Sequence, residues 1–308
     1  MKSNFELFTH RRHLARFISR YELFMKILKI FFYLSFFGIL FLSCSNEDSE
    51  INSEPEIIEA YEALNVSYGL DNNQVFDIYL PENRTEDTKI LFLIHGGSWV
   101  GGDKEEMNGV KDYILENHPS LGIVNMNYTL AGANSPPVPM QTDDISEVVN
   151  YITTNKSSLI VSDDIGFIGV SAGAHLSLLW SYANDTNNQV AMVCSIVGPV
   201  NFTDPAYYNS TNPVYQSIYL LFGNPSIPFL ESASPYHTAT ATSPPTLLFY
   251  GGQDPLVPSS QGIDLDSQLT NLGVTHEFTF YEEEGHGWVG QNLEDTFTKI
   301  SNYINQYL

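Results

Sequence analysis

The feature that most restricts the fold of this chain is the pentapeptide Gly169-Val170-Ser171-Ala172-Gly173. An apolar run typical of a buried strand precedes it, over residues 164–168, and an apolar helix-like run follows at 174–180. In that context Gly-x-Ser-x-Gly predicts a nucleophile elbow, a turn so tight that glycines flank it and the serine hydroxyl projects over the sheet edge. The alternative is a turn with no chemical role, because the pentapeptide alone is common. The context favours Ser171 as a nucleophile.

The same alternation of apolar runs and helix-like segments continues along most of the chain. It predicts an α/β fold with a mostly parallel central sheet and helices on both faces. Another strand-like stretch precedes the first run with no helix between them, so we expect the sheet to begin antiparallel. The predicted strands are 74–80, 90–95, 122–128, 165–170, 190–197, 246–250 and 276–281, and the predicted helices are 140–157, 172–183, 259–272 and 292–308.

Residues 201–245 interrupt this alternation between two predicted core strands. The segment is rich in Tyr, Ser, Pro and Asn. Long connections inside compact domains are usually functional, so we expect a cap-like insertion over the site. Its tyrosines are candidates for stacking against a sugar: Tyr207, Tyr208, Tyr215 and Tyr219.

The N-terminal segment resembles an export signal. A short basic stretch at 25–29 precedes an apolar run of 13 residues at 30–42. This run is too short to span a bilayer but suits a signal-peptide core. It leads into Leu42-Ser43-Cys44, which resembles a bacterial lipobox and predicts lipidation of Cys44. Met25 is then the expected start, with residues 1–24 an extension upstream of it; a membrane-anchoring helix that is never cleaved is the alternative.

These observations divide the chain into three parts. We expect a signal and lipoprotein segment at 1–44, a polar acidic tether at 45–57 and a catalytic domain at 58–308. The tether has too little apolar surface to order itself. A lipid on Cys44 would anchor the domain to a membrane of the bacterial cell envelope, on the periplasmic or cell-surface side of the outer membrane.

Charge and cysteine content exclude several partners. Residues 1–44 hold seven of the 13 Lys and Arg residues and two of the 36 Asp and Glu residues, which leaves six basic and 34 acidic residues and a net charge of −28 with His neutral. Such a surface repels nucleic acid and argues against polyanionic substrates. The only cysteine besides Cys44 is Cys194, whose apolar surroundings predict a small buried residue. With no cysteine cluster and no phosphate-binding glycine pattern, we expect no metal and no cofactor.

A serine nucleophile needs an adjacent base that a third group orients. Asp254 is the candidate acid because it follows the predicted strand 246–250. His286 is the candidate base because it lies between two glycines after the last predicted strand, and an imidazole with a pKa near ~6.5 can take and return a proton at neutral pH. Other acids and histidines are less favoured. Asp204 lies in the insertion, and Asp264 and Asp266 lie on an exposed helical face. His276 lies at a sheet edge, and His175 lies on the helix after the pentapeptide.

Negative charge that develops on a substrate oxygen needs backbone N–H donors. The sequence His95-Gly96-Gly97-Ser98-Trp99 follows the predicted strand 90–95, so the N–H groups of Gly96 and Gly97 are candidates, and His95 is expected to hold the loop by hydrogen bonds. The N–H of the residue after the nucleophile, Ala172, is a third candidate. Two tryptophans beside these motifs are candidate substrate contacts, Trp99 and Trp288, with anchoring of the loop an equal alternative for the first.

From about residue 77 to residue 308 the chain resembles the α/β-hydrolase esterases. The branches that it resembles are the bifunctional feruloyl/acetyl-xylan esterase-like and hormone-sensitive-lipase-like carboxylesterases. The stretches that carry the resemblance are 77–81, 95–104, 127–130, 169–176, 233–235, 244–248, 252–258 and 285–287. The resemblance implies a Ser171–His286–Asp254 triad. Many relatives carry a third glycine where this chain has Ser98, which would narrow the oxyanion loop.

The sequence therefore predicts a serine esterase that hydrolyses carboxylic esters through an acyl-enzyme. The predicted substrate is an acetyl or feruloyl ester of a plant polysaccharide. A general small-molecule carboxylesterase, lipase or formamidase is the first alternative. A non-catalytic binding protein on the same scaffold is a remote one, because it predicts the loss of at least one triad residue and none is missing. The acyl group, the alcohol and the oligomeric state stay open.

Overall fold

The structure is a computed structural model that describes residues 57–308 except 133, 209 and 224. The predicted signal segment with Cys44 and nearly all of the predicted tether lie outside the described residues. Within the described part of the chain, no helix has both the length and the apolar character needed to cross a bilayer.

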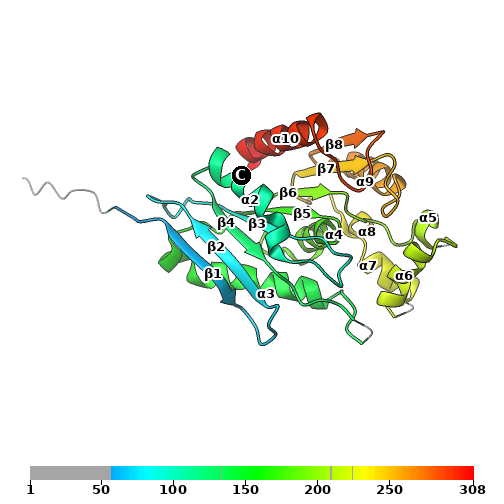
Figure 1. Ribbon diagram of the computed structural model, residues 1–308, viewed down its shortest axis with the longest axis horizontal. Coiled ribbons are helices and arrows are strands. Elements are labelled where there is room, and N and C mark those ends of the chain that lie inside the picture. The colour runs from blue at the N-terminus through cyan, green and yellow to red at the C-terminus, as the bar shows by residue number, and fades with distance from the viewer. Residues whose placement is uncertain (1–56, 133, 209, 224) are drawn as a thin grey trace, which may run out of the picture. The chain divides into compact units, whose positions relative to one another are not determined.

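An eight-stranded sheet lies at the centre of the fold (Figure 1). Its strands are β1 (Tyr61–Ser67), β2 (Val75–Leu80), β3 (Ile90–Ile94), β4 (Gly122–Met126), β5 (Ile165–Val170), β6 (Val190–Ile196), β7 (Thr246–Gly251) and β8 (His276–Tyr281). Their order is β1-β2-β4-β3-β5-β6-β7-β8. β2 is antiparallel to both of its neighbours, and all later pairs are parallel. The predicted antiparallel start and parallel remainder are confirmed.

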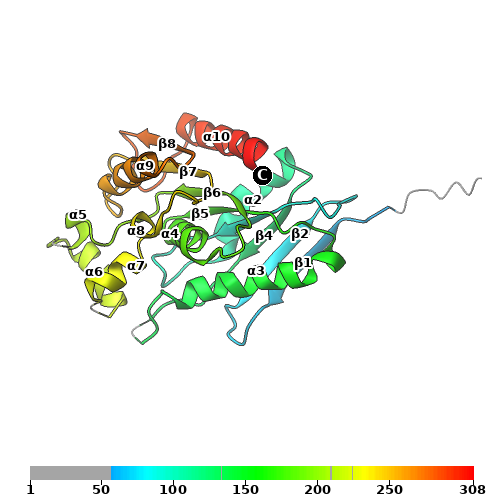
Figure 2. The same ribbon diagram turned by 180° about the vertical axis from the view of Figure 1, so that it is seen from behind.

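Helices cover both faces of this sheet (Figures 1 and 2). One face packs against α3 (Met140–Leu159), α4 (Ala172–Leu179) and α9 (Ser260–Leu272), and the other against α2 (Asn108–Asn117) and α10 (Gln291–Tyr307). Side chains of a strand alternate between faces, so Phe92 and Ile94 join the first core while Leu91 and Leu93 join the second. α2 was not predicted, because Ile114 is its only buried residue and its apolar periodicity is weak.

The described residues between β6 and β7 form four short helices. They are α5 (Pro205–Tyr208), α6 (Pro213–Leu221), α7 (Ile227–Ser232) and α8 (Pro235–Thr238). Local sequence explains where α6 begins: the Asn212 side chain accepts the N–H of Val214, and Pro213 occupies the first turn, where no N–H is needed. Figure 1 shows α5, α6 and α7 grouped at one end of the described chain.

A buried ion pair joins β2 to the segment that follows β3. Lys104 Nζ lies 2.9 Å from Asp77 Oδ2, and the two side chains are only 7% and 9% exposed. The other oxygen of Asp77 accepts the N–H of Asn65 at 2.7 Å. Loss of one partner of a buried pair typically costs about 3–5 kcal/mol, because the remaining charge is left uncompensated. The pair therefore holds the first strands against the loop that approaches the elbow.

The strand order changes direction at β3. The chain passes from β3 to β4 on one side and then to β5 on the other. In open α/β sheets such a switch point leaves a crevice at the carboxyl ends of the strands. Ile94 is in register with Gly169, so the residues that follow β3 and β5 leave the sheet side by side. The candidate oxyanion loop and the elbow are thereby neighbours.

Candidate active site

The predicted elbow is present at the carboxyl end of β5. Ser171 has φ 54° and ψ −117°, a region that non-glycine residues adopt only under strain. Close packing holds it there: a Cβ on Gly169 would lie 2.3 Å from the carbonyl oxygen of Gly173, and a Cβ on Gly173 would lie 2.2 Å from that of Ile94. Both glycines are therefore required sterically, and the turn aims the serine side chain away from the sheet.

A chain of two hydrogen bonds joins the three residues predicted as a triad. His286 Nε2 lies 2.9 Å from Ser171 Oγ, and His286 Nδ1 lies 2.7 Å from Asp254 Oδ2. A carboxylate only accepts, so the Asp254 contact requires the proton on Nδ1 and leaves Nε2 free to accept the serine O–H. The fold brings together side chains separated by 115 and 32 residues along the sequence.

The two loops that carry Asp254 and His286 are bonded to each other. The N–H of Gln253 donates to the carbonyl of Glu284 at 2.8 Å. The free oxygen of Asp254 accepts the N–H groups of Leu256 and Val257 at 2.8 and 3.0 Å, and its side chain is 1% exposed. The acid is thus held rigidly, whereas the His286 side chain is 23% exposed and accessible from the crevice.

The loop after β3 packs directly on the elbow. A Cβ on Gly96 would lie 3.2 Å from the carbonyl oxygen of Val170. The next three residues, Gly97, Ser98 and Trp99, all have positive φ, at 109°, 52° and 65°. Ala172 begins α4, and the first N–H groups of a helix have no acceptor within it. Backbone donors of the loop and of α4 are therefore available around Ser171, as an oxyanion site requires.

His95 fixes the position of this loop by ring stacking and a hydrogen bond. Its ring stacks on Tyr128 with centroids 4.2 Å apart, and Nδ1 donates to the carbonyl of Gly96 at 2.7 Å. The Tyr128 hydroxyl donates to the same carbonyl at 3.0 Å. Burial lowers the pKa of His95 below its ordinary value, so the ring stays neutral and serves as a brace.

His175 lies beneath the elbow rather than in the site. The indole N–H of Trp99 donates to His175 Nδ1 at 3.1 Å, and His175 Nε2 donates to the carbonyl of Ala233 at 2.8 Å. The side chain is fully buried, and burial lowers its pKa to about 4. The neutral ring therefore joins the oxyanion loop, α4 and the insertion through one pair of hydrogen bonds.

The other candidate acids and bases have structural partners. Asp204 is buried in the insertion and accepts from Gln261 at 2.7 Å and from the N–H of Ala206 at 2.8 Å. His276, at the start of β8, pairs with Asp266 at 3.1 Å. Cys194 is buried and unpaired, and within residues 57–308, leaving aside 133, 209 and 224, no cluster of His, Cys, Asp or Glu could hold a metal ion.

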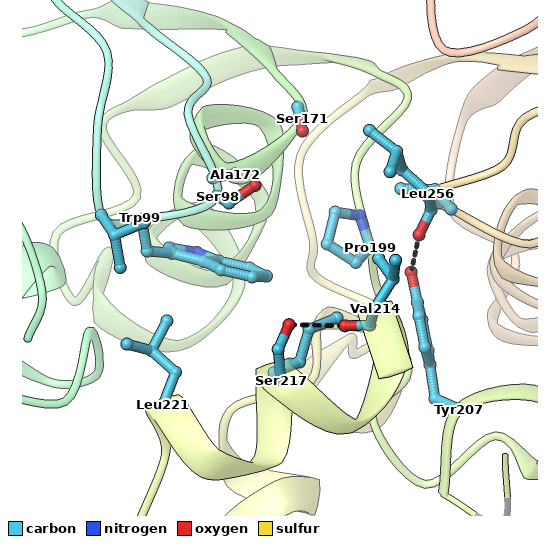
Figure 3. Close-up of a pocket in the computed structure, with 13 residues that line it drawn as sticks. Ser98, Trp99, Ser171, Ala172, Pro199, Tyr207, Val214, Ser217, Leu221 and Leu256 are labelled. Carbon is cyan, nitrogen blue, oxygen red and sulfur yellow. Dashed lines mark hydrogen bonds between the residues drawn. The ribbon is translucent and has the colours of Figure 1, made fainter. Parts of the chain in front are cut away.

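A cavity of about 210 Å³ opens beside Ser171 (Figure 3). Trp99 lines it while its N–H is held by His175, so the residue both anchors the loop and contributes to the wall. Trp288 is not among the described residues that line the cavity. Its indole lies in an edge-type contact with Tyr281, with ring centroids 4.8 Å apart, and its N–H donates to the hydroxyl of Thr296 at 2.8 Å in α10.

The tyrosines of the insertion, expected as a sugar-stacking surface, contact one another and the backbone of the insertion. Tyr207 is 1% exposed, and Tyr215 lies edge-on against it with centroids 4.9 Å apart. The hydroxyl of Tyr219 donates to the carbonyl of Phe202 at 2.6 Å. Tyr208, at 47% exposed, is the one of the four that counts as exposed. The physical reason is that a short insertion needs its own apolar contacts to stay folded.

Sequence reasoning missed most of the cavity wall. Most of the missed residues come from α6 and from the turn after Asp254, and the others follow the oxyanion loop and β6: Val214, Ser217, Ile218, Leu221, Leu256, Val257, Val100 and Pro199. The sequence does carry a signal for an amphipathic helix here. Asn-Pro begins residues 212–221, and apolar side chains recur at 214, 218 and 221. The Tyr- and Pro-rich composition of the insertion obscured it.

Fold and site geometry together define an α/β-hydrolase. The BD-FAE family model matches residues 76–269, more than half of the 308-residue chain, and the chain belongs to that family. The chain is 24% identical to a probable isoprenylcysteine alpha-carbonyl methylesterase of Arabidopsis thaliana, over 78% of this chain and 56% of that protein. It is also 24% identical to the esterase LipC of Mycobacterium tuberculosis, over 78% of this chain and 64% of that one.

A solved structure shares the fold. It is described as a truncated form of a carbohydrate esterase from gut microbiota, and it superposes with a TM-score of 0.66 at 21% identity, over 79% of this chain and 96% of that one. The chain spans less than two thirds of the length of each of the two curated relatives named above. The solved structure therefore shows the fold, and the match to the BD-FAE family model shows the family.

The buried His175 predicts a pH dependence of stability. Its pKa is about 4 in the folded chain against about 6.5 in the unfolded chain, so the unfolded state takes up the proton first as pH falls. The contribution of neutral His175 to the free energy of unfolding is fully present above about pH 6.5. Up to roughly 3 kcal/mol of it is lost as the pH falls to 4. In urea titrations, His175→Asn, which cannot titrate here, should lose correspondingly less stability than the parent. Parallel profiles for two chains that are both folded at pH 7 would contradict this account.

Proposed function

We propose that the chain is a serine hydrolase of carboxylic esters, with Ser171, His286 and Asp254 as its catalytic triad. The observation that carries the proposal is the position of His286, with one ring nitrogen 2.9 Å from the serine oxygen and the other 2.7 Å from the carboxylate. Membership of the BD-FAE family and the esterase names of its relatives support it.

Each step of the proposed mechanism uses an atom already in position. Ser171 Oγ attacks the ester carbonyl carbon while its proton passes to His286 Nε2, which Asp254 stabilises as imidazolium. The tetrahedral intermediate collapses when Nε2 returns that proton to the leaving alcohol, which leaves an acyl group on Ser171. Water, deprotonated by the same nitrogen, then attacks the acyl-enzyme, and the acid leaves as the serine regains its proton.

The negative oxygen of the intermediate would be held by backbone N–H groups of Gly96, Gly97 and Ala172. The packing of the loop on the elbow and the free first turn of α4 support this assignment. Loss of one such donor typically costs about 10²–10³ in rate. The strained φ of Ser98 shows that a side chain is accommodated where many relatives have glycine.

Ser171→Ala tests the triad most directly. We expect kcat on 4-nitrophenyl acetate to fall by about 10⁴-fold or more, because no acyl-enzyme can form. A fluorophosphonate probe should label the parent and leave the variant unlabelled. Ser181→Ala is a suitable control, since that hydroxyl only donates back to the carbonyl of Ser177. Equal turnover by the parent and Ser171→Ala would refute the proposal.

We propose acyl groups on plant polysaccharide, acetyl or feruloyl, as the substrate. The carbohydrate-esterase description of a structural neighbour and the envelope location expected from the N-terminal segment support it. A small-molecule carboxylesterase is the second candidate, favoured by the methylesterase name of a relative and by the lack of charged side chains among the described residues that line the cavity.

A substrate panel separates these two candidates. We expect release of acetate from acetylated xylan, or of ferulate from feruloylated arabinoxylan, at a kcat/KM at least comparable with that for methyl ferulate and short free esters. The reason is that binding of the remote sugar chain adds transition-state stabilisation. Activity confined to free esters would reject the polysaccharide and retain the esterase. N-formylkynurenine in the same panel tests the formamidase alternative.

We propose that a lipid on Cys44 anchors the enzyme in the bacterial cell envelope. The apolar run at 30–42, followed by Leu-Ser-Cys, supports this placement. The parent expressed in a bacterium should incorporate labelled palmitate and sediment with membranes, whereas Cys44→Ser should do neither, because the thiol that accepts the lipid is gone. Membrane association of Cys44→Ser without palmitate would instead indicate an uncleaved helix.

A further inference from the structure

One helix of the insertion, α6, lines one side of the cavity. Val214, Ser217, Ile218 and Leu221 of α6 all line it. Their spacing of three, one and three residues places them on a single face of the helix. Figure 3 shows the labelled members of this face directed toward Trp99 and Pro199 across the cavity. Leu220 points elsewhere and is 69% exposed.

The cavity is suited to an uncharged, largely apolar group. None of the described residues that line it is Asp, Glu, Lys, Arg or His. The hydroxyl of Ser217 donates to the carbonyl of Val214 at 2.6 Å, and that of Tyr207 to the carbonyl of Leu256 at 3.3 Å. Both hydroxyl groups therefore donate to backbone carbonyls rather than to a ligand in the cavity. A carboxylate or an ammonium group would find no counter-charge among these residues, although the chain as a whole is strongly acidic.

The position of the cavity assigns it to the acyl side of an ester. His286 must lie next to the leaving oxygen to protonate it, yet His286 is not among the described residues that line the cavity. The cavity reaches Ser171 along Ser98 and Ala172 instead. A substrate carbonyl above Ser171 therefore has its alcohol beside His286 and its acyl substituent in the cavity.

The cavity volume favours an acyl group larger than acetyl. About 210 Å³ is available, whereas an apolar cavity of about 150 Å³ accommodates a whole benzene molecule. The methyl of an acetyl group would leave most of the α6 face without contact. A branched acyl chain, or an aromatic ring with a short linker, would cover it.

We propose that α6 determines acyl specificity, that its face binds an uncharged apolar acyl group larger than acetyl, and that the small side chain of Ser217 sets the depth of this pocket. The proposal rests on the proposed function, since it takes Ser171 as the nucleophile. It also ranks substrates: among esters of one alcohol, aromatic or branched acyl groups should exceed acetyl in kcat/KM.

The test compares 4-nitrophenyl acetate, butyrate and benzoate. Each methylene that fits a hydrophobic pocket is worth roughly tenfold or more in kcat/KM, so the parent should favour butyrate over acetate by at least about tenfold. Ser217→Phe fills the pocket and should lower this ratio at least about tenfold. Leu220→Phe adds the same ring to the exposed side of the same helix and should leave the ratio unchanged.

A second variant and a second series of esters separate the possible outcomes. Leu221→Ala enlarges the pocket and should shift the preference toward hexanoate, which decides the matter if Ser217→Phe does not fold. A parent that hydrolyses none of these esters refutes the proposed function itself. An active parent whose acyl preference is unchanged in both Ser217→Phe and Leu221→Ala overturns the assignment of α6. A variant that alters the ranking of ethyl, butyl and benzyl acetates, but not of the acyl series, assigns the cavity to the alcohol instead.

Discussion

The contact on which the rest of the site depends is the close approach of the elbow to the end of β3. The carbonyl oxygens of Ile94 and His95 occupy the space where a Cβ on Gly173 would lie, at 2.2 and 2.3 Å. This approach strains Ser171, aims its hydroxyl over the sheet edge and brings the oxyanion loop into contact with it. The strain, of order 1–3 kcal/mol, is sustained because two parallel strands and a buried helix hold the backbone from both sides.

Two kinds of histidine surround this contact and perform different tasks. His95 and His175 are buried, neutral and used as fixed hydrogen-bonding braces for the loop and for α4. His286 lies on a partly exposed loop between the acid and the serine. The arrangement is consistent with a general base, which must exchange protons with substrate and water, whereas a brace must not titrate in the working range. The Trp99 indole links His175 to the cavity, so loop position and cavity shape depend on the same side chain.

Much of the fold and of the candidate triad could be predicted because short segments carried the information. Apolar runs of strand length, a Gly-x-Ser-x-Gly pattern and polar residues directly after strands are local signals, and the parallel sheet then brings strand ends to one edge. The insertion was different. Its tyrosines resembled a binding surface, but Tyr207 and Tyr215 pack against each other, and four of the residues that line the cavity come from α6. Trp288 is likewise placed only by the tertiary structure, in which its indole lies beside Tyr281 and its N–H donates to Thr296.

The sequence by itself therefore determined the α/β architecture, the elbow, the order of acid and base, and the glycines on which the turn depends, since each follows from steric and periodic rules within a few residues. Only the tertiary structure gives the distance between His286 and Ser171, and only it decided which tryptophan reaches the cavity and which face of the insertion lines it. Those outcomes depend on distances between side chains far apart in the chain, such as the 115 residues between Ser171 and His286. Packing of whole elements sets such distances, and no local pattern encodes them.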